Sequence, residues 1–135
     1  MPIFALCGVT LLHRAFLFSE ILLIIMKEIL KGNIFENAEA EKKDFEIFEA
    51  LAESDHALVE RIISSGQKTP DGQWLQQDRN EWVLLLKGNA RISFAEGYDF
   101  ELNPGDHLFI PSDKKHRVTY TSADPECIWI AFHFE

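Results

Sequence analysis

The stretch of sequence that decides the fold is GDHLFIPSDKKH, residues 105–116. A Pro-Gly pair opens it with a turn, and the short apolar run 107–110 follows. Pro111 begins a second turn, and the stretch ends on the single imidazole of His116. Glycine and proline favour tight turns because of their special backbone angles, so the spacing predicts a short strand between two turns, with His116 delivered by the second one.

Upstream of this stretch, Glu81 is followed after six residues by Gly88. The two segments together resemble the two sequence motifs of the cupin family. The second cupin motif spaces Gly, Pro, Gly, His and Asn, and the matching positions in this chain are Gly105, Pro111, Asp113, His116 and Tyr120. The resemblance covers roughly residues 57–134 and implies an all-β fold, the cupin-type double-stranded β-helix or jelly-roll barrel.

The first cupin motif is incomplete in this chain. Its glycine falls on Thr69, and its pair of histidines falls on Leu75 and Gln77. With a spacing one residue longer, the pair falls on Trp74 and Gln76 instead. The departure matters because the family resemblance implies a centre of three imidazoles and one carboxylate around a divalent transition metal.

The metal ligands that the resemblance implies here are Glu81 and His116, with Gln77 as a tentative third. Gln76 joins them only in the longer spacing, and His133 on the last strand is the best candidate for a second imidazole. Imidazole and carboxylate ligands suit Fe, Mn, Ni, Cu or Zn, whereas an amide oxygen is a much weaker donor. This set predicts weak binding of a divalent metal.

The same residues also allow a site without metal. A buried Glu81 could pair with His116 or Gln77, since buried charges persist when they are paired. Such a pair would keep His116 charged and would bind a polar ligand directly. The predicted ligand pocket is then lined by Gln76, Gln77, Glu81, His116 and Tyr120.

Short β-prone runs separated by turn residues follow one another from residue 57 onward. They predict strands at 58–63, 74–77, 81–87, 90–95, 100–102, 107–110, 117–121 and 127–134. Gly88 and Asn89 predict a tight hairpin between two of these strands, because both residue types tolerate positive φ. Before the strands, Phe45, Phe48 and Ala52 recur at helical spacing among charged residues and predict one amphipathic helix over 39–54.

Length and composition limit the architecture and the partners. A chain of 135 residues fits one domain, and its 47% hydrophobic content indicates a globular interior. The net charge of −9 and the absence of an extended basic cluster exclude a nucleic-acid surface. Its two cysteines, Cys7 and Cys127, form no disulfide framework or Cys-x-x-Cys site, which favours a reducing cytoplasm.

The first residues differ in character from the rest. The segment 3–25 is strongly apolar, but His13, Arg14 and Glu20 interrupt it, so it predicts no membrane span. Met26 begins a more ordinary sequence, and we interpret residues 1–25 as an N-terminal extension, a start-site artefact in one reading and a docking helix in the other. The predicted domains are this extension, an arm with the helix over 26–56, and the barrel over 57–135.

Two of the predicted strands, 82–86 and 128–132, are apolar on both faces. Both faces must therefore be covered by protein, and a homodimer is the simplest cover.

Three functions fit this sequence. The first is binding of a small polar molecule in the barrel, with or without a weak metal. The second is a metal-dependent enzyme, an isomerase or oxygenase, acting on a small organic acid or sugar derivative. The third is a dimeric scaffold that binds nothing.

Overall fold

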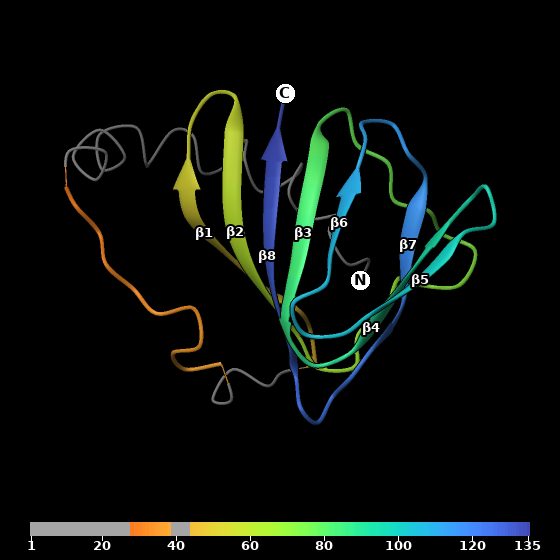
Figure 1. Ribbon diagram of the computed structural model, residues 1–135, viewed down its shortest axis with the longest axis horizontal. Helices are drawn as coiled ribbons and strands as arrows, with labels where there is room; N and C mark the ends of the chain where they lie inside the picture. Colours follow the sequence, from red (N-terminus) through yellow and green to blue (C-terminus); the bar gives the residue numbers. More distant parts are fainter. Residues whose placement is uncertain (1–27, 39–43) are drawn as a thin grey trace.

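The computed structural model describes residues 28–38 and 44–135, and these residues contain strands and loops but no helix. Eight strands form two antiparallel sheets (Figure 1), as expected for a jelly roll. The five-stranded sheet has the order β1-β2-β8-β3-β6, and the three-stranded sheet has the order β5-β4-β7. The strand bounds are β1 Ile47–Glu53, β2 Ala57–Ser64, β3 Asn80–Lys87, β4 Ala90–Phe94, β5 Asp99–Leu102, β6 His107–Ile110, β7 His116–Thr121 and β8 Cys127–Phe134.

The core lies between the two sheets and follows the alternation of the strands. On β3, Val83 and Leu85 are fully buried, while the intervening side chains are only partly buried. On β8, Trp129 and Ala131 occupy the same layer and are also fully buried. Successive side chains of a strand point to opposite faces, so the inward face of each strand fills the core and the outward face needs another cover.

The predicted helix over 39–54 is wrong where the structure describes it, because Ile47–Glu53 form strand β1. The remainder of that prediction includes residues 39–43, which lie outside the described residues, as does the predicted extension 1–25. Strand β1 pairs with β2, with Phe48 opposite Ile62 on the core side and Ile47 opposite Ile63 on the outer side. Pairing with a neighbouring strand satisfies the backbone and overrides the weak helical spacing of three apolar residues.

Two further sequence predictions need correction. Residues 74–77 form no strand, since only Leu75 makes an isolated bridge, to His116. Gly88 and Asn89 do not close a hairpin, because β3 and β4 belong to different sheets. Gly88 instead forms the corner where the chain crosses between the sheets, and its positive φ of 85° is the part of the prediction that is confirmed.

The turns around the quoted stretch are confirmed. Gly105 adopts a φ of 96° in the turn before β6. Asp113, at the second glycine position of the cupin motif, has a φ of 64°, which Asp tolerates better than most side chains. The turn at 111–115 therefore carries the chain from β6 in one sheet to His116 at the start of β7 in the other.

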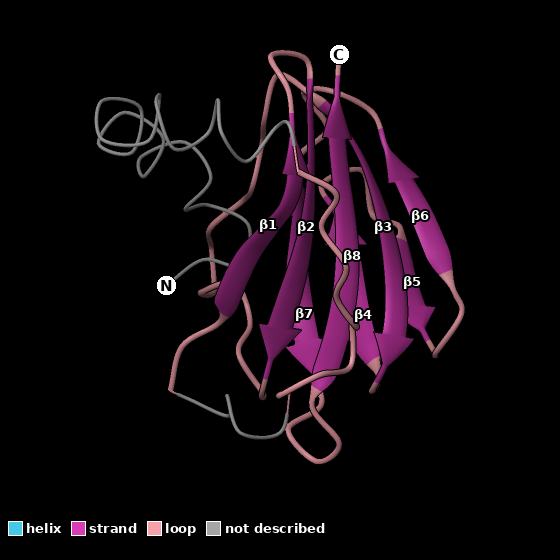
Figure 2. Ribbon diagram, turned by 90° about the vertical axis from the view of Figure 1, so that its left-hand side faces the viewer, coloured by secondary structure: helices cyan, strands magenta, loops and turns pink. Residues whose placement is uncertain are grey.

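An N-terminal arm, residues 28–38, runs in front of the five-stranded sheet (Figure 2). Arg61 on the outer face of β2 anchors this arm by donating hydrogen bonds to the carbonyls of Ile34 and Glu36. Ala38 packs with Ile63 and Ile128 in a second, small apolar cluster. The arm therefore covers only one part of the outer face. No helix in the described part of the chain is long and apolar enough to span a membrane.

Candidate functional site

Two strand starts and one strand end bring the candidate residues together. The starts of β3 and β7 and the end of β8 lie at the upper end of the molecule in Figure 1. Glu81 near the start of β3 is the register partner of His133 on β8 and of Ile110 on β6. His116 is the first residue of β7 in the facing sheet. The predicted residues Glu81, His116 and His133 are all buried at this end of the barrel.

His116 carries its proton on Nδ1. That nitrogen lies 2.9 Å from the backbone carbonyl oxygen of Lys114, which can only accept a hydrogen bond. Burial lowers the pKa of His116, and the bond to Lys114 opposes this shift only in part. The imidazole is therefore neutral, with the lone pair of Nε2 free to accept. This result differs from the charged histidine expected from the sequence.

Glu81 is fully buried, and only one of its two carboxylate oxygens has a hydrogen-bond partner within the described part of the chain. The Gln77 amide donates a hydrogen bond of 2.6 Å to Oε2, as the metal-free interpretation expected. The same oxygen lies 3.8 Å from Nε2 of His116, too far for a hydrogen bond. Among the described residues, neither Oε1 of Glu81 nor Nε2 of His116 has a hydrogen-bond partner.

Burial raises the pKa of Glu81 to about 7. The charge of His133 opposes this shift, the charge of Glu60 adds to it, and the bond from Gln77 opposes it. Removing a carboxylate from water disfavours its charged form, so the shift follows from the position of Glu81 inside the barrel. Near neutral pH this carboxyl can hold or release a proton.

A second buried pair lies beside the first. Nε2 of His133 is 3.0 Å from Oε1 of Glu60 on β2, and both side chains are almost fully buried. Burial lowers the pKa of His133, but the hydrogen bond to Glu60 and the nearby charges of Glu81 and Glu60 outweigh it, so the net pKa is raised. The Nε2 atom of His133 is thus directed at the carboxylate of Glu60.

The sequence analysis missed Glu60. The sequence feature that could have indicated Glu60 is its position in the apolar run 58–63, where it shares the inward face with Leu58 and Ile62. A carboxylate at a core position of a strand requires a partner, and that requirement could have indicated a buried ion pair.

Two predicted pocket residues do not reach the pair. Gln76 is exposed, and its amide donates to the carbonyl of Asp113 at 3.1 Å. Tyr120 is 50% exposed and lies opposite Arg91 on β4. The pairing of β4 with β7 shifts register between Arg91 and Ile92, so an extra residue in β7 turns Tyr120 outward.

A strap, residues 69–77, covers the buried pair from the side of β7. Its Leu75 exchanges two backbone hydrogen bonds with His116, of 2.7 and 3.1 Å. The carbonyl of Gln77 accepts a bond of 2.7 Å from the amide of Asp113. The strap therefore fixes both Gln77 above Glu81 and the turn that delivers His116.

The residues present do not fit the metal centre that the fold family implies. Within the described ranges, no group of three His, Cys, Asp or Glu side chains is arranged to hold a metal ion. Among the described residues, Oε1 of Glu81 and Nε2 of His116 are the buried lone-pair atoms left without a hydrogen-bond partner. Leu75 and Gln77 occupy the positions of the two further histidines. Two protein ligands fall short of the three that catalytic metal sites usually keep.

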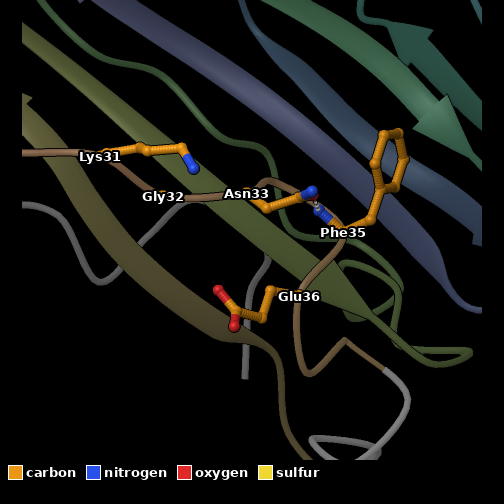
Figure 3. A pocket seen from close by; sticks show the side chains of 5 residues that line it. All are labelled: Lys31, Gly32, Asn33, Phe35 and Glu36. Atoms are coloured by element: carbon orange, nitrogen blue, oxygen red, sulfur yellow. Dashed lines mark hydrogen bonds between the residues drawn. The ribbon is translucent and has the colours of Figure 1, made fainter.

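An open hollow elsewhere on the surface is unrelated to this pair. Lys31, Gly32, Asn33, Phe35 and Glu36 line it (Figure 3), and all five belong to the N-terminal arm. The lysine and glutamate side chains in Figure 3 do not converge on a common point with the phenylalanine. The lining of this hollow contains none of the buried titratable groups described above.

Comparison with known proteins agrees with this geometry. The family model described as cupin domain matches residues 63–133. A "putative mannose-6-phosphate isomerase" from Ralstonia eutropha JMP134 is 33% identical, with a TM-score of 0.75 over 79% of this chain and 99% of that one. A cupin superfamily protein from Desulfitobacterium hafniense DCB-2 is 18% identical, with a TM-score of 0.63 over 79% of this chain and 93% of that one. No curated protein matches the chain.

Proposed function

Because the chain belongs to the cupin domain family, we propose that its barrel binds a small polar molecule through Glu81 and His116. The observation that supports this proposal is the pair of unpartnered buried atoms, Oε1 of Glu81 and Nε2 of His116. A buried polar atom without a partner costs about 1–3 kcal/mol, so folding alone gives no reason to keep two of them side by side. A ligand that bonds to both atoms recovers this cost.

Binding is tested by screening the full chain against a library of small polar molecules of all charge classes, with ligand-observed NMR as the readout. Glu81→Ala should abolish the binding that the wild-type chain shows. The matched control is Glu46→Ala, which removes a partly buried carboxyl that accepts a hydrogen bond from Ser64 instead. Equal binding by the wild-type chain and Glu81→Ala would contradict the proposal, and the absence of any binding would favour the scaffold.

A second candidate function is metal-dependent isomerisation of a sugar derivative. It is favoured by the relative from Ralstonia eutropha, which is 33% identical over most of this chain. Its test is the transition-metal content of the purified full chain beside that of Glu81→Ala and His116→Ala, together with an assay for isomerisation of mannose 6-phosphate. Near-stoichiometric metal that both variants lose would support this function, whereas trace metal in all three proteins would exclude it.

A homodimer is the partner that we propose for the outer face of the five-stranded sheet. Phe109 and Phe134 stack there, as do Phe132 and Phe134, and Trp82 lies against His107. Phe109 is 53% exposed, so this aromatic face is still open to solvent in one copy of the chain. A second copy would cover it.

A further inference from the structure

The two free atoms of the buried pair are both hydrogen-bond acceptors. Nδ1 of His116 carries the ring proton and donates it to the carbonyl of Lys114, so Nε2 has only a lone pair. Oε2 of Glu81 already accepts from Gln77, and the ionised form of the carboxyl leaves Oε1 as a second acceptor. When Glu81 is ionised, a ligand that satisfies this pair must therefore supply two hydrogen-bond donors.

Two cations near the pair are bound to carboxylates, and a third, Arg117, has an unpartnered Nε but lies on the other face of β7. Lys114 is paired with Glu96, and His133 is bonded to Glu60. The guanidinium of Arg117 lies 5.2 Å above the ring of Trp74, on the side of β7 opposite to His116. An acidic group brought to Oε1 of Glu81 would meet a carboxylate and a neutral imidazole, and the nearby charge of His133 is already paired with Glu60.

From this donor and charge arrangement we infer that the group recognised by Glu81 and His116 is an uncharged pair of adjacent hydroxyls, as in a polyol. The inference rests on the proposed binding function and specifies its ligand class. Each hydroxyl donates one hydrogen bond, one to Oε1 of Glu81 and one to Nε2 of His116. Phosphate and carboxylate groups of a ligand are kept away from this end of the barrel.

An ammonium ion would also supply donors, but the site favours hydroxyls over it. Burying a full charge carries a large desolvation cost, and the negative charge of Glu81 is already opposed by the neighbouring His133. A hydroxyl loses far less hydration when it is buried with a partner. The two acceptor atoms thus favour a ligand that carries hydrogen-bond donors but no net charge.

We place the ligand's route to the pair at Gln77. This side chain is only partly buried, and its neighbours Gln76 and Asp78 are exposed. The strap that carries it is held to His116 by an isolated bridge and not by a ladder of strand pairs. Backbone hydrogen bonds hold the strap at Thr69, Leu75 and Gln77, so a ligand reaches the pair only when the segment around Gln77 opens locally.

The experiment compares matched ligands on the full chain by isothermal titration calorimetry. The uncharged probes are D-mannose and D-sorbitol, the acidic probes are D-mannose 6-phosphate and D-gluconate, and the amine probe is D-glucosamine. We expect the uncharged probes to bind at least about tenfold more tightly than their charged counterparts. Glu81→Gln and His116→Phe should each weaken that binding by about tenfold or more. Glu81→Gln removes the negative charge of one acceptor, and His116→Phe removes the other acceptor.

The control is Glu46→Gln, whose carboxyl bonds to Ser64 at the opposite end of β2 and which should bind as the wild-type chain does. Circular dichroism confirms that each variant is folded. Tighter binding of an acid or of the amine, dependent on Glu81, would overturn the hydroxyl inference and leave the proposed function standing. Binding of none of the probes would overturn the inference by showing that water alone satisfies the pair, and binding of no compound in the wider screen would overturn the proposed function as well.

Discussion

Gly88 lies at the corner between the two sheets, where the backbone leaves no room for a side chain. A Cβ at this position would lie 2.8 Å from Sγ of Cys127, the carbonyl of Glu126 and Oγ of Ser122. The φ of 85° adds strain for any L-residue. We expect Gly88→Ala to lower the free energy of unfolding by about 2–5 kcal/mol, the sum of a left-handed backbone cost and an overpacking cost.

Urea denaturation measures this loss, and Gly97 supplies the matched control. Gly97 has a φ of 99°, but a Cβ there would meet nothing within 4 Å. Gly97→Ala should therefore show the backbone cost alone, about 1–2 kcal/mol. Equal losses in the two variants would mean that the close contacts around Gly88 contribute nothing.

Glu81 makes the stability of the fold depend on pH. Burial raises its pKa from 4.5 to about 7, so between these pH values the folded chain keeps a proton that the unfolded chain has lost. The folded state therefore loses stability as pH rises through this window, by up to about 3 kcal/mol. Glu81→Gln removes this dependence, and its stability relative to the wild-type chain should rise from pH 4.5 to 7 and then level off.

Urea denaturation at a series of pH values gives the profile, and Glu46→Gln is the control. Burial raises the pKa of Glu46 to about 8, so its contribution should continue to change up to about pH 8. Parallel profiles for the wild-type chain and Glu81→Gln would show that Glu81 ionises as it does in water.

At the scale of elements, the strap 69–77 depends on Thr69 for its attachment to β7. The amide of Thr69 donates to the carbonyl of Val118 at 2.8 Å, and its Oγ1 accepts from the amide of Val118 at 3.0 Å. Thr69→Val should leave the amide of Val118 without its acceptor and cost about 1–3 kcal/mol. Hydrogen exchange at the Val118 amide should be faster in Thr69→Val than in the wild-type chain.

The control for this prediction is Thr119→Val on the same strand. Oγ1 of Thr119 makes only long hydrogen bonds of 3.3 Å, with Ser93 and the carbonyl of Arg91, at partly exposed positions. Its loss should cost less than that of Thr69. Unchanged exchange at Val118 in Thr69→Val would show that the strap is held by other contacts.

The elements also show what the sequence could predict. The strands β2 to β8 carry dense β-prone residues between turn signals, and all seven were predicted within one residue or two of their ends. Strand β1 was missed because only Ile47 and Phe48 are even partly buried, so an edge strand leaves little alternation to detect. The inward position of Glu81 and His116 follows from the family spacing, whereas the outward turn of Tyr120 depends on a register shift that no sequence pattern reveals.

At the scale of the whole molecule, buried carboxyls lie near both ends of the barrel but have different surroundings. Glu81 and Glu60 lie at the end where β8 finishes, next to His116 and His133. Glu126 lies at the other end and is neutralised by Lys87 at 2.7 Å. Among the described residues, only the first end combines buried charge with unpartnered polar atoms, and it is the end at which we propose ligand binding.

The outer face of the five-stranded sheet is where a second copy of the chain should bind. The chain carries a net charge of −9, so two copies repel each other over most of their surfaces. The outward positions of β3, β6 and β8 are aromatic or aliphatic apart from Asn80, Lys87 and His107, and they bring no carboxylates together. We expect a dimer by light scattering, and Phe109→Lys should convert it to a monomer because the substitution buries a charge at the interface.

Tyr98→Lys is the control, since Tyr98 is 63% exposed beside the three-stranded sheet. A monomeric wild-type chain, or a dimer that only Tyr98→Lys disrupts, would show that this face is not the interface.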